Sequence, residues 1–148
     1  MRRIDQKTTF IKGEEISRDW YVIDASKIEL GRLASVVVFY LMGKNKAKYA
    51  GDSNIGNCVI VTNAEKIKLS SEGKLDKKKF QSHSMYPKGF KEVSLRYLMN
   101  KSHKKVIESA VLGMLPKNKL RDRYMSKLHI VEGVEHKYVA QKPVEIKL

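Results

Sequence analysis

Two apolar runs with an apolar helix between them constrain the fold of this chain more than any other feature. WYVID at 20–24 and CVIVTN at 58–63 are rich in strand-forming residues. Between them, Leu30 to Met42 has a helical pattern that ends at Gly43, a residue type preferred just after a helix. Uninterrupted apolar strands are typical of sheets covered on both faces, so the pattern predicts an α/β fold with a mostly parallel sheet. The helix is apolar nearly all round, and we expect it to be buried on several sides.

The rest of the chain predicts shorter elements separated by turns. These are hairpin strands at 66–70 and 77–84 around SSEGKL, a Pro/Gly turn at 85–90, helices at 93–100, 103–115 and 119–128, and a strand at 129–132 before a polar tail. Ser102 is placed to cap the second of these helices, and Pro116 ends it. Residues 1–18 lack periodicity and predict an extended arm before a single α/β domain at 19–148.

The charge of the chain is its most unusual compositional property. The formal net charge is +14 over 148 residues, with 30 Lys and Arg. A folded domain with this much self-repulsion favours a polyanionic partner, which is nucleic acid more often than an anionic membrane. The longest apolar run, at 33–42, is far shorter than the roughly 20 residues that cross a bilayer. With one cysteine and no secretory pattern at the N-terminus, the chain is expected to be soluble and cytoplasmic, without a membrane partner.

Enzymatic and metal-binding functions have little support in the residue pattern. The four histidines have no zinc-ligand spacing, so we expect no metal and no cofactor. Cys58 lies inside an apolar run, where a thiol is usually inert. Asp24 and Asp52 could hold a catalytic magnesium ion, which leaves a metal-dependent enzyme acting on nucleic acid as one alternative.

Cations gather in three segments, at 44–48, 77–91 and 117–127. In each segment they predict contacts with RNA phosphates. In a helix at 119–128, an apolar row through Tyr124 lies beside a basic row of Lys119, Arg123 and Lys127, whose mutual repulsion a bound polyanion would relieve. The alternative is that these side chains are merely solvated. The candidate RNA-binding residues are Lys44, Lys46, Lys48, Lys79, His83, Lys88, Lys91, Lys117, Lys119, Arg121, Arg123 and Lys127.

Five motifs, in order along residues 20–143, resemble the large-ribosomal-subunit protein thirteen family. They are WYVIDASKIELGRLASVVVFYLMGKNK, VIVTNAEKI, KKFQSHSMYPKG, VIESAVLGMLPKNKL and EHKYVAQKP. The chain departs from the family pattern at Asn57, which replaces Asp, at Lys88, which replaces Gly, and at Tyr138, which replaces His. It also has Arg121-Asp122 in place of Gly-Arg, and either Arg121 or Arg123 is expected to supply the missing charge.

The resemblance implies a three-layer α/β/α domain with a four-stranded, mostly parallel sheet and basic loop extensions. It also implies a non-enzymatic structural component of the large ribosomal subunit, which needs no cofactor. Such a protein binds large-subunit ribosomal RNA early in assembly and touches neighbouring ribosomal proteins. The mechanism we expect is electrostatic clamping of the folded RNA. A free-standing regulator that binds messenger RNA, for example its own, is the alternative that the residues leave open.

Overall fold

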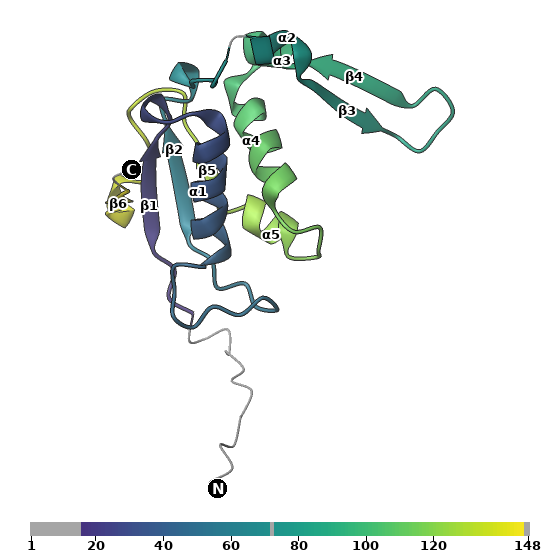
Figure 1. Ribbon diagram of the computed structural model, residues 1–148. Helices are drawn as coiled ribbons and strands as arrows, with labels where there is room; N and C mark the ends of the chain where they lie inside the picture. The colour runs from purple at the N-terminus through teal and green to yellow at the C-terminus, as the bar shows by residue number, and fades with distance from the viewer. Residues whose placement is uncertain (1–15, 72, 147–148) are drawn as a thin grey trace, which may run out of the picture.

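A four-stranded sheet lies at the centre of the computed structural model, which describes residues 16–71 and 73–146 (Figure 1). Its strands are β1 (Trp20–Asp24), β2 (Cys58–Thr62), β5 (Leu128–Ile130) and β6 (Val144–Glu145). They lie in the order β5-β2-β1-β6, and every neighbouring pair is parallel. This confirms the predicted α/β class. Of the predicted arm, residues 1–15 lie outside the described part of the chain.

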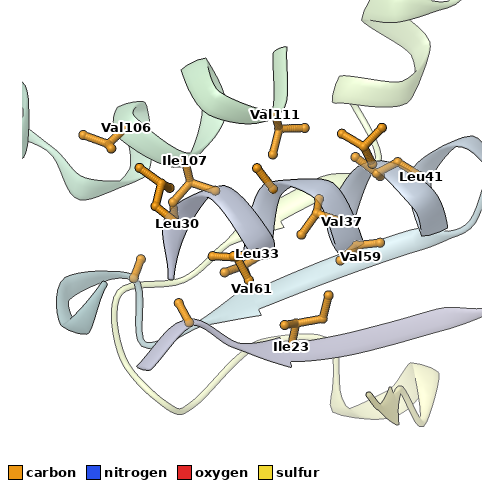
Figure 2. Packing of buried hydrophobic residues seen from close by; sticks show 14 of the residues in the cluster. Ile23, Leu30, Leu33, Val37, Leu41, Val59, Val61, Val106, Ile107 and Val111 are labelled. Carbon is orange, nitrogen blue, oxygen red and sulfur yellow. The ribbon is translucent and has the colours of Figure 1, made fainter. Parts of the chain in front are cut away.

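Helix α1 (Leu30–Met42) forms over the predicted residues and ends at Gly43, whose φ of 78° is left-handed. Its buried side chains pack on Ile23, Val59 and Val61 of the sheet and on α4 (His103–Met114), as Figure 2 shows. Each such side chain contributes roughly 1.5–3 kcal/mol on burial. The expectation of burial on several sides is wrong for Phe39, which is 43% exposed.

The opposite face of the sheet is covered by the C-terminal segment. Tyr21 packs on Tyr40 of α1, so its neighbour Trp20 faces the other way. There Trp20 stacks on His129 and Tyr138, with ring centroids 5.4 and 5.2 Å away. Tyr138 directly precedes the short 3₁₀ helix η4 (Val139–Gln141). The outer layer on this face is therefore thin. The predicted polar tail is partly wrong, because Val144–Glu145 pairs with β1 as a fourth strand.

The predicted hairpin at 66–84 is wrong. Residues Ala64–Lys66 form the 3₁₀ helix η3, and Gly73–Lys77 form α2. The actual hairpin pairs β3 (Lys79–His83) with β4 (Phe90–Ser94) across the predicted Pro/Gly turn, and Figure 1 shows it projecting away from the sheet. The alternating apolar and polar residues at 66–70 do not form a strand. Within this segment only Lys68 makes an isolated β-bridge, with Glu29.

Three further predictions shift at their ends. The helix predicted at 93–100 is α3 (Leu95–Lys101), because β4 includes Ser94, whose hydroxyl accepts a hydrogen bond from the Tyr97 amide at 3.3 Å and caps α3. Ser102 occupies the N-cap position of α4 without a capping hydrogen bond. The helix predicted at 119–128 is only α5 (Arg121–Met125), and Leu128 already belongs to β5. The remaining helix is η2 (Ala25–Lys27).

Candidate nucleic-acid interface

The β3–β4 hairpin carries one group of exposed cations. Lys79 lies in β3, where it makes an ion pair with Glu92, while Lys91 lies opposite Ser82. At the tip, Met85 and Tyr86 are 88% and 75% exposed. His83 Nδ1 accepts a hydrogen bond from the Met85 amide at 2.9 Å, which leaves its other ring nitrogen free for a ligand.

In the turn of this hairpin, Lys88 adopts a strained backbone conformation. Lys88 has a φ of 61°, a left-handed conformation that suits glycine, the residue expected here from the family pattern. The following Gly89 is buried and donates its amide to Tyr86 O at 2.9 Å. A Cβ on Gly89 would come within 2.8 Å of the backbone oxygen of Tyr86, besides meeting Ser84 Oγ. A side chain at position 89 would therefore clash with the turn. Lys88 instead adopts a strained backbone conformation and presents an exposed charge.

The loop at 43–57 divides its three lysines between the surface and the interior. Lys44 and Lys48 are exposed. Lys46 turns inward, where its Nζ donates to Ser17 O and to Ile55 O at 3.3 Å and lies 3.8 Å from a carboxylate oxygen of Asp19. Burial lowers the pKa of Lys46 even though Asp19 opposes the shift. Lys46 is thus placed to hold the loop.

Lys127 lies in the interior, contrary to the exposed basic row predicted for it. Its exposed fraction is 8%, and Nζ donates to Gly56 O at 2.8 Å and to Asn54 Oδ1 at 2.6 Å. Burial, with Arg18 adding, lowers the pKa of Lys127 to about 8. The helical pattern misplaced this residue because α5 ends at Met125, before Lys127.

Gly56 and Asn57 fix the same loop against the C-terminal end of α1. A Cβ on Gly56 would meet Leu41 O at 1.6 Å. The side chain of Asn57 is fully buried, donates to Asn45 Oδ1 at 2.9 Å and accepts from the Asp19 amide at 3.3 Å. An aspartate, expected here from the family pattern, has no N–H to donate to Asn45. Asn57 therefore donates a hydrogen bond to the loop that an aspartate at this position could not.

The segment at 117–123 has a mixed role. Lys117, Lys119 and Arg123 are exposed. Arg121 instead donates from Nε to Leu112 O at 3.1 Å, and a second guanidinium nitrogen bonds the same oxygen. That carbonyl lies in the last turn of α4 and has no N–H partner within the helix. The side chain of Arg121 therefore caps the C-terminal end of α4. Of the two arginines expected to replace the missing charge, Arg123 is the one free to do so.

The elements that carry these cations lie at opposite ends of α4 (Figure 1). The hairpin joins one end through α2 and α3, while α5 packs at the other. The hydrogen bonds of Lys127 tie the loop at 43–57 to the second end. With 12 residues, α4 is about 18 Å long at 1.5 Å per residue. Sequence reasoning missed Arg32, an exposed cation on the first turns of α1, because its apolar neighbours masked it.

Asp24, one of the two alternative catalytic carboxylates, is engaged in hydrogen bonds within the protein. Asp24 Oδ1 accepts hydrogen bonds from Ser26 N at 3.0 Å and Asn63 Nδ2 at 2.8 Å. Partial burial raises the pKa of Asp24, but these hydrogen bonds outweigh it and the pKa lies below its ordinary value. Burial raises the pKa of the Cys58 thiol, which disfavours the reactive thiolate. Across residues 16–71 and 73–146, no three His, Cys, Asp or Glu side chains cluster to hold a metal.

Membrane-spanning helices are also lacking from the described residues: each helix there is too short or too polar.

Comparison with known proteins gives one consistent family. Residues 18–137 match the model of the family described as ribosomal protein L13. The chain is 45% identical over 142 residues to large ribosomal subunit protein uL13 of Caldicellulosiruptor saccharolyticus, covering 96% of this chain and 99% of the relative. It is 45% identical to the uL13 protein of Aquifex aeolicus, over 96% and 98% of the two chains. The uL13 protein of Lachnospira eligens is 47% identical over 95% and 99%.

Proposed function

Because the chain belongs to the ribosomal protein L13 family, we propose that it is a structural component of the large ribosomal subunit that binds and stabilises folded large-subunit ribosomal RNA. Membership of a ribosomal-protein family makes it a structural protein and not an enzyme, as the sequence predicted. Its proposed partners are that RNA and neighbouring ribosomal proteins, and its proposed location is the cytoplasmic ribosome. The relatives' names refer to the ribosomal subunit, which favours this role over a regulator that binds messenger RNA.

The observation that carries the mechanism is the division of exposed cations between the two ends of α4. A core shared by α1, α4 and the sheet joins these ends. Each group can neutralise phosphates on a different part of the RNA, and the core holds the elements that carry them at opposite ends of α4, a helix about 18 Å long. The protein thereby clamps two RNA segments in their folded arrangement, and we propose that it does so early in assembly.

We assign the predicted residues to two kinds of role. Exposed side chains are proposed to contact RNA: Lys44, Lys48, Lys117, Lys119 and Arg123 at one end, and Lys79, His83, Lys88 and Lys91 at the other. The other three hold the loops that present them: Lys46, Arg121 and Lys127. We keep the division into an arm at 1–18 and a domain at 19–148 as part of this proposal.

Sedimentation tests the ribosomal role. In extract from growing cells, the protein should sediment with large subunits and, after pulse labelling, with their early precursors. Recovery mainly outside these particles would contradict the proposal. Entry only into late particles would contradict its early-assembly part.

Salt dependence tests the electrostatic contacts. Lys119→Ala plus Arg123→Ala should flatten the dependence of the logarithm of affinity for folded RNA on the logarithm of salt concentration by about 0.7–0.9 per lost contact. The control, Lys105→Ala plus Lys137→Ala, removes equal charge from exposed positions that we assign no RNA contact. Equal flattening in both variants would mean that only net charge matters.

A further inference from the structure

Two helical glycines have no explanation in the fold. Gly31 lies at the start of α1 and Gly113 in the last turn of α4. Neither has a positive φ. A Cβ added to either would meet nothing within 4 Å. Glycine is the least favourable residue in a helix after proline, so neither conformation nor packing accounts for its presence here.

Both glycines line the same cavity. It has a volume of about 650 Å³ and lies between α1, α4 and the base of the hairpin. A second cavity of about 640 Å³ adjoins it and shares Glu29 and Arg32 in its lining. These volumes are in the range of about 300–1,000 Å³ that is typical of ligand sites. We call the first cavity the glycine groove; its lining includes Gly31, Arg32, Lys74, Lys78, Phe80 and Gly113 beside apolar side chains.

The charged side chains that line the glycine groove are mostly cations. Arg32, Lys74 and Lys78 line it, against one carboxylate, that of Glu29. Lys78 Nζ lies 5.6 Å from the centre of the Phe80 ring, and Lys74 Nζ is bonded to the Ser70 hydroxyl. Arg32 makes no ion pair or side-chain hydrogen bond with any described residue. The guanidinium of Arg32 is thus available beside the groove.

We propose that the glycine groove binds a looped segment of RNA, an inference that rests on the function proposed above. A phosphate contacts Arg32 and Lys74, and an unstacked base lies beside Phe80. Gly31 and Gly113 let the sugar–phosphate backbone approach both helices closely. The excess of cations favours a polyanion over a protein segment. Phe80 lies in β3 and lines the groove, so the groove adjoins the base of the hairpin.

Filling the groove tests the proposal. Gly113→Gln and Gly31→Gln add an uncharged side chain to open space. Gly133→Gln is the matched control, since a Cβ there also meets nothing within 4 Å, and Gly133 does not line the groove. We expect the first two variants to bind large-subunit RNA at least tenfold more weakly, with the midpoint of thermal unfolding unchanged or raised. Gly133→Gln should bind like wild type.

Footprints of wild type and variants on the same RNA separate the possible failures. We expect Gly113→Gln to lose protection of one unpaired segment while protection elsewhere remains. Unchanged affinity and footprint in both groove variants would overturn the inference. If the groove variants bind RNA like wild type but enter large-subunit particles poorly, the groove binds a protein segment and the RNA proposal is wrong. Absence of RNA binding by the wild type would refute the proposed function itself.

Discussion

Replacing Lys127 by methionine should remove a specific part of the pH dependence of stability. The pKa of Lys127 is lowered from 10.5 to about 8, mainly by burial. Between these values the unfolded chain holds a proton that the folded chain has released, so the free energy of unfolding rises with pH. From pH about 7 to about 9.5, the gain from this one group is about 2 kcal/mol. Lys127→Met should lack that gain.

The assay is urea unfolding across this pH range. Trp20, the single tryptophan, stacks on His129 and Tyr138, so its fluorescence should report unfolding. Both proteins should also carry Cys58→Ala, because the pKa of Cys58 is raised by burial and would contribute the opposite slope. The quantity compared is the difference in unfolding free energy between the two proteins at each pH.

Parallel curves for the two proteins would refute the argument, because they would mean that Lys127 titrates alike in the folded and unfolded chains. RNA binding gives an independent check. If Lys127 holds the loop from inside, Lys127→Met should leave the salt dependence of RNA affinity unchanged while the protein is folded. A slope reduced by about one contact would show that Lys127 reaches a phosphate.

Three further substitutions probe other parts of the structure. Arg121→Gln should lower the free energy of unfolding by about 1 kcal/mol, because the end of α4 loses its cap, yet leave the salt dependence of RNA binding unchanged; a flattened dependence would contradict this role. Lys88→Gly should relieve about 1 kcal/mol of backbone strain, seen as slower amide exchange in the hairpin, whereas Lys88→Ala should not. Gly56→Ala should cost about 3 kcal/mol or more in urea unfolding, since its Cβ would meet Leu41 O at 1.6 Å, while the exposed Gly51→Ala should be nearly neutral.

Sequence reasoning succeeded where one local pattern decides the structure. Leu30 to Met42 is apolar at helical spacing and stops at a glycine, so both ends of α1 were predictable. It failed where distant partners decide. Strand β6 has two residues and exists only because β1 offers it an open edge. The 66–70 segment alternates like a strand, yet it finds no ladder to join.

The candidate interface divides in the same way. The sequence shows which residues are cationic, and it locates the Pro/Gly turn at 85–90, although it places the hairpin elsewhere. It does not show which cations are already bound within the protein. Lys46, Arg121 and Lys127 each donate to a backbone carbonyl that lies close in space. Lys127 and Gly56 are 71 residues apart, so no local pattern could reveal that contact.

The order of the sheet also determines when the domain can fold during synthesis. The inner strands β1 and β2 are made first, whereas β5 and β6 at the two edges come from residues 128–130 and 144–145. Until those residues emerge from the ribosome that synthesises the chain, the backbone groups on the outer sides of β1 and β2 have no strand partners. Such open edges promote aggregation. A chain that stalls before β6 therefore has its cationic loops but an incomplete sheet. Under this topology, only a chain made as far as residue 145 can present its RNA-binding surfaces on a finished sheet.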